Sequence, residues 1–198
     1  MSNISLSSGR TKQKQKTRAK ILKTVQRLLP KGGARNLEDV AQASGISRAT
    51  IYRYFSNIDT LCSEASLDVH TKSPVTLFQE VKHLTLIDRV LYIQDYFNDL
   101  ALQNEAAFRT YLSLYLKEDP NNPKRSSRGS RRTASLKLAL IPLQNQLDVN
   151  TYNKLIAIST TLMGIEPIIT TKDVCGLQDE EAKDALKWGL EIILGAML

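Results

Sequence analysis

Arginine, threonine and tyrosine recur at close spacing in residues 48–54, and their side chains have the clearest chemistry in the chain. Arg48 and Arg53 carry planar cations with several hydrogen-bond donors, a geometry that fits phosphate oxygens and the edge of guanine. Thr50 and Tyr52 add hydroxyl groups between them. On a helix that enters a major groove, such side chains meet bases and phosphates.

The surrounding residues predict two short helices joined by a tight turn, which would position these side chains. Asn36 is the expected N-cap of the first helix, with Asp39 three residues on, as in a capping box. Gly45 can take the positive φ that a sharp turn needs. Ser47 can cap a second helix that runs through Tyr54. The pattern is that of a helix-turn-helix.

Two further helices are expected to complete this head. A helix from Thr17 to Leu29 carries apolar residues at helical spacing and supplies the third side of a small core. Either Ser56 or Asn57 can cap a helix over residues 59–70.

The stretch AQASGISRATIYRYFSNIDTL, residues 41–61, resembles the DNA-binding domain of the TetR (tetracycline-repressor-like) family of transcription regulators. The resemblance covers residues 16–62 and matches many positions at the right spacing, including Arg18 in the first helix. One departure is Ile58, where many relatives have a lysine that can reach a phosphate.

The resemblance implies a set of DNA-binding residues: Thr17, Arg18, Ser47, Arg48, Ala49, Thr50, Tyr52, Arg53 and Tyr54. Arg48, Ala49 and Arg53 are the expected contacts to base edges, and Tyr52 matches a phosphate contact. Packing in the core is the alternative for Tyr52 and Tyr54.

The fold class expected for the whole chain is all-α, because apolar residues recur at helical spacing beyond Pro74. Three parts are expected: a disordered basic arm at 1–15, the helix-turn-helix domain at 16–62, and a larger helical domain at 63–198. The later helices are expected near residues 75–82, 86–103, 105–117, 131–147, 150–165 and 179–197. Pro142 should kink its helix or start a new turn, and Pro167 should end the one before it.

Charge is distributed unevenly along the chain. Residues 1–58 hold twelve Lys and Arg against two acids, a net +10, whereas residues 59–198 hold fifteen against eighteen, a net −3. A basic head on a mildly acidic body indicates a polyanionic partner at one end. Residues 124–132, with five positive charges, read as a loop.

The resemblance also implies that the larger domain binds an effector and forms a homodimer. The candidate effector residues are aromatic and acidic: Tyr92, Asp95, Tyr96, Asp99, Phe108, Tyr111 and Tyr115. The candidate dimer residues form apolar stripes on two helices: Leu155, Ile158, Leu162, Ala182, Ala185, Leu186, Gly189, Leu190 and Ile193. An ordinary core is the alternative for both sets.

Other functions find little support in the sequence. No signal peptide, membrane span, metal-ligand spacing or catalytic constellation is evident, so we expect no cofactor, no metal and no enzyme activity. Two cysteines fit a cytoplasmic location. The sequence predicts a homodimeric repressor that binds a roughly palindromic double-stranded operator and is released by a small-molecule ligand. The alternative is a nucleoid-organising or protein-partner-controlled DNA-binding protein without a small ligand.

Overall fold

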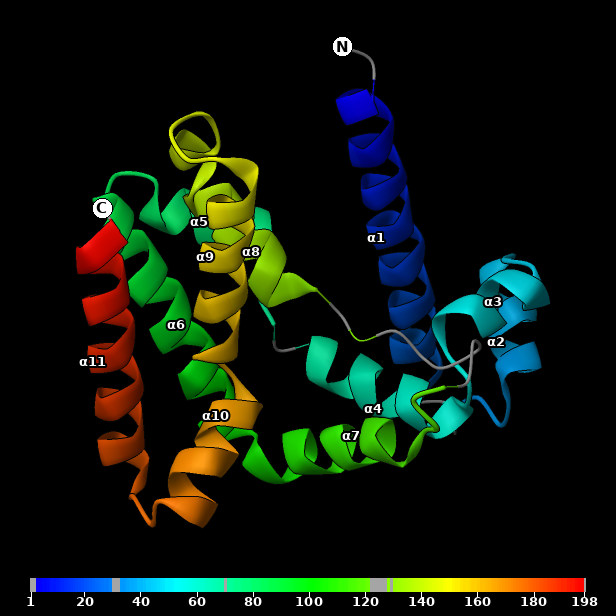
Figure 1. Ribbon diagram of the computed structural model, residues 1–198. Helices are drawn as coiled ribbons and strands as arrows, with labels where there is room; N and C mark the ends of the chain where they lie inside the picture. The colour runs from blue at the N-terminus through cyan, green and yellow to red at the C-terminus, as the bar shows by residue number, and fades with distance from the viewer. Residues whose placement is uncertain (1–2, 30–32, 70, 122–127, 129, 198) are drawn as a thin grey trace. The chain divides into compact units, whose positions relative to one another are not determined.

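The computed structural model describes residues 3–29, 33–69, 71–121, 128 and 130–197, and within these ranges the fold is all-α (Figure 1). The helices are α1 (Asn3–Leu28), α2 (Leu37–Ser44), α3 (Arg48–Tyr54), α4 (Ile58–Asp68), α5 (Pro74–Val81), α6 (Leu86–Gln103), α7 (Glu105–Lys117), α8 (Arg131–Ala139), α9 (Val149–Thr161), α10 (Ile165–Ile169) and α11 (Asp179–Met197). The fold class predicted from the sequence is confirmed. None of the helices so described has the length and apolar character that a membrane span requires.

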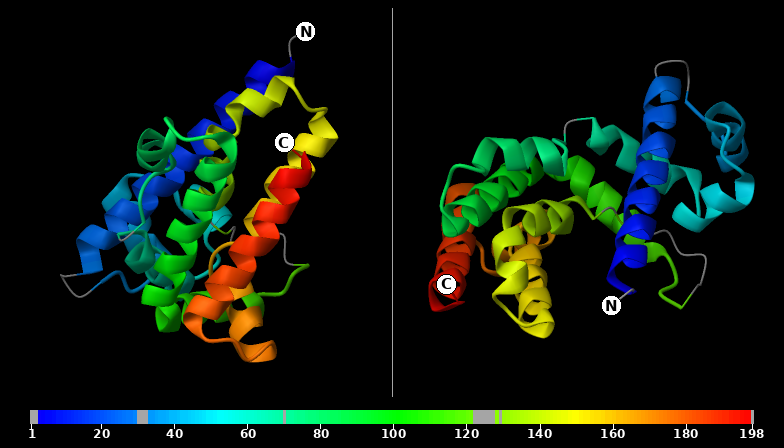
Figure 2. Two further views of the ribbon diagram at one scale, coloured as in Figure 1. Left: turned by 90° about the vertical axis from the view of Figure 1, so that its left-hand side faces the viewer. Right: turned by 90° about the horizontal axis from the view of Figure 1, so that it is seen from above.

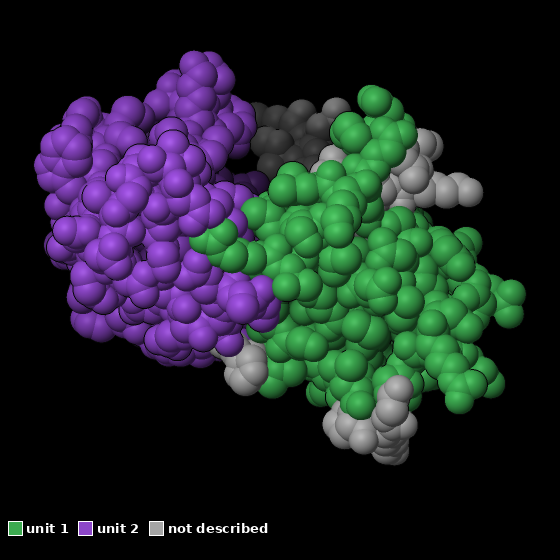
Figure 3. Space-filling model, turned by 90° about the horizontal axis from the view of Figure 1, so that it is seen from below, with its two compact units in different colours: residues 1–70, 109–128 green, residues 71–108, 129–198 purple. Residues whose placement is uncertain are grey.

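The chain forms two compact units, shown in different colours in Figure 3. Unit 1 contains residues 1–70 and 109–128, and unit 2 contains residues 71–108 and 129–198. This grouping differs from the expected division after residue 62, because most of α7 belongs with the N-terminal helices. Side-chain hydrogen bonds from α7 to α4, described below, hold it there, and helical periodicity along the sequence carries no sign of them.

Unit 1 is organised around the packing of α1 along α4, with α2 and α3 beside the C-terminal half of α1 (Figure 1, Figure 2). Its core consists of apolar residues from all four helices: Ile21, Leu22, Val25, Leu37, Val40, Ala41, Ile51, Tyr54, Phe55, Leu61 and Ala65. Two short helices cannot bury enough apolar surface alone, so α1 and α4 complete the core.

The arm expected to be disordered at residues 1–15 is instead helical from Asn3, as the first part of α1. Lysine, arginine and glutamine are good helix formers, and extending a helix that Ile21 and Val25 already anchor avoids a new nucleation step. Thr17 and Arg18 therefore lie inside a helix rather than at its start. The positive end of the helix dipole is not at Thr17, and the expected phosphate contact there loses its physical basis.

Unit 2 has a separate core, in which α6 packs against α5, α8, α10 and α11. The buried residues come from nearly every helix of the unit: Leu77, Val90, Leu91, Ile93, Phe97, Leu100, Leu136, Ala139, Leu140, Leu143, Tyr152, Leu155, Ile156, Met163, Leu190 and Leu194.

Three of the expected helices have the predicted bounds, namely α6, α7 and α11. The helix expected at 131–147 ends at Ala139, and a 3-10 turn with Pro142 in its first turn follows. Proline has no N–H to donate and fits the start of a new turn, as one reading of Pro142 predicted.

The helix expected at 150–165 ends at Thr161, before Pro167. Gly164 then adopts a φ of 87°, which side chains rarely allow, and its N–H donates to Asn98 Oδ1 at 2.7 Å. Arg132 donates to the carbonyl of Met163 and to both carboxylate oxygens of Glu166. Pro167 lies within α10. The break between α9 and α10 is therefore at Gly164, which these hydrogen bonds hold in place, and not at the proline.

Candidate nucleic-acid interface

The turn between α2 and α3 is built as the sequence predicted. Asn36 caps α2 by accepting from the N–H of Asp39 at 2.9 Å, and the Asp39 carboxylate accepts from the N–H of Arg35. Gly45 ends the helix in the left-handed region, with φ 67° and ψ 21°. Ser47 then caps α3 by accepting from the N–H of Thr50 at 3.3 Å. These caps fix the direction in which α3 leaves the turn.

Six of the seven residues of α3 are either buried in the core or exposed to solvent, and Thr50 is half-buried. Ile51 is fully buried and Tyr54 is 6% exposed, which anchors one side of the helix. Arg48, Ala49, Tyr52 and Arg53 are exposed on the other side, at the i, i+1, i+4, i+5 spacing of one helical face. We call these four residues the α3 outer face. It presents two guanidinium groups and a phenol around a residue small enough for close approach.

The hydroxyl groups near this face already have partners within the protein. Ser47 Oγ donates to Thr50 Oγ1 at 2.9 Å. Tyr52 donates to Glu38 Oε1 of α2 at 2.8 Å, a contact between residues fourteen positions apart. The same hydrogen bond lowers the pKa of Glu38 and raises that of Tyr52, so Glu38 is a carboxylate and Tyr52 a neutral phenol at neutral pH. Glu38 was not among the residues singled out in the sequence.

Arg18, expected at the DNA surface, points into unit 1 instead. Its Nε donates to Glu64 Oε1 at 2.7 Å, its Nη2 pairs with Glu64 Oε2, and its guanidinium lies 4.5 Å from the centre of the Phe55 ring. The side chains of Arg18 and Glu64 are only 12% and 11% exposed. The guanidinium is committed to Glu64, so we remove Arg18 from the DNA-binding set.

Tyr111 and Tyr115 of α7, expected to bind an effector, complete this buried cluster in unit 1. Tyr111 donates to Glu64 Oε2 at 2.9 Å and Tyr115 at 3.2 Å, and their rings meet edge to face. Burial, reinforced by the Glu64 charge, raises the pKa of Tyr115 to about 12 and also raises that of Tyr111. Both phenols therefore stay protonated and serve as donors to one buried carboxylate.

Three other positions near the interface have partners within the protein. Thr17 Oγ1 donates to the carbonyl of Gln13 within α1. Tyr54 is buried, as the core-packing alternative predicted. Ile58 begins α4 half-buried and packs against the core, so this position supports the fold rather than a phosphate contact.

The other effector candidates lie on α6 and α7 in unit 2, and their polar groups are engaged locally. Lys187 of α11 pairs with Asp95 at 2.8 Å and Lys183 pairs with Asp99 at 2.7 Å. These ion pairs neutralise both acids, which removes the reason to expect a cationic ligand at them.

The aromatic candidates of unit 2 have separate partners within the unit. Tyr92 donates to Glu80 Oε2 at 3.0 Å, and Tyr96 accepts from the N–H of Lys72 at 2.6 Å. Phe108 is half-buried and packs against the core of unit 2.

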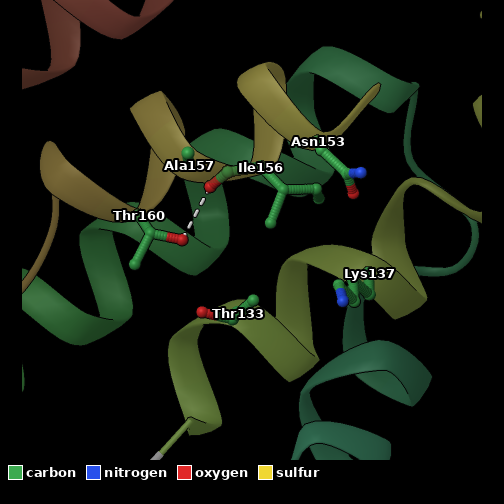
Figure 4. A pocket seen from close by; sticks show the side chains of 6 residues that line it. All are labelled: Thr133, Lys137, Asn153, Ile156, Ala157 and Thr160. Atoms are coloured by element: carbon green, nitrogen blue, oxygen red, sulfur yellow. Dashed lines mark hydrogen bonds between the residues drawn. The ribbon is translucent and has the colours of Figure 1, made fainter. Parts of the chain in front are cut away.

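A surface groove of about 340 Å³ does lie in unit 2, between α8 and α9. Figure 4 shows its lining: Thr133, Lys137, Asn153, Ile156, Ala157 and Thr160. None of the residues expected to bind an effector lines it. The groove is open and has few polar groups aimed at one point, so it does not define a specific ligand site.

The expected dimer residues divide between the core and the surface of unit 2. Leu155, Ala182, Leu186 and Leu190 are buried within the unit. Ile158 and Ala185 are exposed, whereas Leu162, Gly189 and Ile193 are half-buried.

The exposed side of α11 contains two residues that the sequence reading omitted. Trp188 is 66% exposed and Ile192 is 52% exposed. Their spacing from Ala185 was visible in the sequence. On α11 the predicted stripe is more continuous, and its residues Ala182, Leu186 and Leu190 are buried within unit 2.

Comparison with known families gives one match, and it covers the helix-turn-helix. Residues 21–65 match the family model described as bacterial regulatory proteins of the tetR family. No curated protein and no solved structure matches the chain. The matched range contains α2, the turn and α3, together with the core residues of α1 and α4 that support them. Residues 21–65 therefore form a DNA-binding helix-turn-helix of the kind found in bacterial regulatory proteins of the tetR family.

Proposed function

We propose that this regulator is a homodimeric repressor, acting in the cytoplasm, that binds a roughly palindromic operator through α3 and leaves it when a small molecule binds unit 2. The observation that carries the DNA-binding part is the α3 outer face. Four side chains suited to DNA share one exposed side of a helix whose other side is locked in the core.

The chemistry of this face supports reading of bases as well as attraction to phosphate. Arg53 is exposed at the end of α3, and Arg48 is exposed at its start. An arginine can donate two hydrogen bonds to guanine, which discriminates against other bases by about 1–3 kcal/mol. Ser47 and Thr50, committed to capping, orient the helix. They are proposed to act on DNA only through that orientation.

Dimerisation is supported by the exposed side of α11. Ala185, Trp188, Gly189 and Ile192 follow helical spacing there, and we call them the α11 outer face. A solvent-facing tryptophan beside small residues suits close packing against a second copy of the chain. Two copies related by a two-fold axis would present two α3 helices and would favour a palindromic site.

Effector binding is supported by buried polar atoms in unit 2. Gln94 Oε1, Ser135 Oγ, Tyr152 Oη and Ser159 Oγ are buried and make no hydrogen bond among the described residues. Each unmade hydrogen bond costs about 1–3 kcal/mol, so a ligand that supplied donors or acceptors to these atoms would stabilise the unit. We propose these atoms, in place of Tyr92, Asp95, Tyr96 and Asp99, as the contacts for a polar effector.

Selection of bound genomic fragments tests the repressor proposal. The purified protein should recover a small set of fragments that share an inverted repeat, and Arg53→Ala should weaken binding to them by about 1–3 kcal/mol while affecting unrelated DNA less. Transcription from a recovered promoter should then fall when the protein is added. Broad recovery without a shared sequence would favour the nucleoid-organising alternative instead.

The oligomeric state tests the α11 outer face. Sedimentation should show a dimer of the native chain, and Trp188→Glu should shift it to monomer because a carboxylate would be buried at the contact. Val174→Glu provides a matched control, since Val174 is 80% exposed but lies outside this face. A native monomer, or a Trp188→Glu dimer of native affinity, would contradict this assignment.

A further inference from the structure

The hydrogen bond from Tyr52 to Glu38 changes what the α3 outer face offers to DNA. A tyrosine hydroxyl has one proton, and here that proton lies toward Glu38 Oε1 at 2.8 Å. While the bond holds, Tyr52 cannot donate to a phosphate oxygen. Its hydroxyl oxygen remains able to accept.

Glu38 strengthens this acceptor character. It lies in the first turn of α2, half-buried, and a carboxylate has no proton to donate. The charge of Arg48 also favours the ionised form of Glu38. An anion at this place opposes close approach of a phosphate, and it accepts hydrogen bonds from amino groups.

We propose that Glu38 and Tyr52 form an acceptor pair that determines sequence specificity, by accepting from the exocyclic amino group of cytosine or adenine. Guanine and thymine present keto oxygens in the major groove, which the acceptor pair cannot satisfy. Glu38 is the specificity-determining residue. Tyr52 adds a second acceptor oxygen beside it, and its hydrogen bond to Glu38 holds its ring in place. The inference rests on the proposal that α3 enters the major groove.

This assignment gives the interface two complementary kinds of reader. Arg48 and Arg53 supply donors, which suit the acceptors of guanine. The acceptor pair instead supplies hydrogen-bond acceptors, from Tyr52 on α3 and from Glu38 on α2. Because it withholds a donor from phosphate, it also lowers affinity for DNA of arbitrary sequence, which raises specificity.

Selection from a randomised double-stranded DNA pool tests the acceptor pair, with the native protein, Glu38→Gln and Tyr52→Phe compared at one salt concentration. The native protein should enrich cytosine or adenine at one position of each half-site. In Glu38→Gln the amide adds a donor, so that preference should fall on the order of tenfold and keto bases should enter. Tyr52→Phe should weaken the preference at the same position.

Controls separate this inference from the proposed function. Glu191→Gln makes the same charge change on α11 and should select the same sequences as the native protein. Unchanged thermal unfolding of Glu38→Gln would show that both residues act at the surface. If Glu38→Gln keeps the native base preferences, or gains affinity equally for all sequences, the acceptor pair is refuted. If the native protein selects no shared sequence, the proposed function itself fails.

Discussion

Arg18 and Arg53 are both arginines of unit 1 that the sequence proposes as DNA contacts, yet the structure places them in opposite environments. Arg18 is buried against Phe55 and bonded to Glu64, whereas Arg53 is exposed, with its guanidinium 5.5 Å from the ring centre of Tyr54. Residue type is the same in both cases. The partner differs: Arg18 is paired with the carboxylate of Glu64, whereas no ion pair joins Arg53 to another residue that the structure describes.

The two arginines also differ in the helices that their contacts join. Arg18 lies in a cluster that joins α1, α4 and α7 through one carboxylate. A second contact joins the ends of α4 and α7. Glu118, just after α7, accepts from Ser56 Oγ at 2.5 Å and from Asn57 Nδ2 at 3.3 Å, just before α4. Hydrogen bonds of this kind fix the segment after α7 against the start of α4. Among the described residues, the contact given for Arg53 is with the ring of its neighbour Tyr54, so this side chain does not join one helix to another.

The largest expected effect is on stability. Arg18→Ala leaves Glu64 buried without its cation, so the free energy of unfolding should fall by about 3–5 kcal/mol. Arg53→Ala should change it by less than about 0.5 kcal/mol, because the side chain is exposed. Urea denaturation followed by circular dichroism measures both. Similar losses in the two variants would break the comparison.

A smaller effect should follow from alkaline pH. Tyrosine in an unfolded chain loses its proton near pH 10, whereas Tyr115 keeps its proton up to about pH 12. The contribution of the protonated Tyr115 phenol to the free energy of unfolding is fully present below pH 10 and is lost as the pH rises toward 12. For this group the free energy of unfolding falls by at most about 1.4 kcal/mol per pH unit. Denaturation curves across this range should show a shallower pH dependence for Tyr115→Phe. An unchanged slope would mean that Tyr115 does not titrate with unfolding.

The smallest effect is expected at Tyr54, which the resemblance proposed as a DNA contact. Its ring is buried in the core of unit 1. Tyr54→Phe keeps the ring, so operator affinity should change by less than about 0.5 kcal/mol in fluorescence anisotropy. A loss comparable with that of Arg53→Ala would return Tyr54 to the interface and show that burial in the free protein does not exclude a DNA contact.

Local rules predicted the helix-turn-helix well because its signals lie within a few residues of one another. Asn36, Ser47 and Asn57 each cap the helix that follows, and Gly45 takes the positive φ expected of it. Long apolar periodicity gave α6, α7 and α11 their bounds. Capping and periodicity depend on neighbouring residues, so a sequence alone displays them.

Contacts between distant residues could not be predicted in this way. Asp95 and Asp99 look like a free acidic face until α11 brings Lys187 and Lys183 to them. Trp188 lies on the exposed side of α11, whereas Ala182, Leu186 and Leu190 of the stripe predicted as an interface are buried in unit 2. Sequence patterns show that a residue is apolar or charged, but they do not show which distant residue packs or pairs with it, because that depends on how the helices cross.

The sequence by itself determined an all-α chain with a basic helix-turn-helix head, because caps, turns and helical periodicity are local. Only the tertiary structure decided which charged and aromatic residues remain for other molecules. It committed Arg18, Tyr111 and Tyr115 to Glu64, joined Tyr52 to Glu38, and left Arg53 exposed. Such pairing depends on where helices cross, and burial makes an unpaired charge too costly to leave, so the fold settles it only when the whole chain packs.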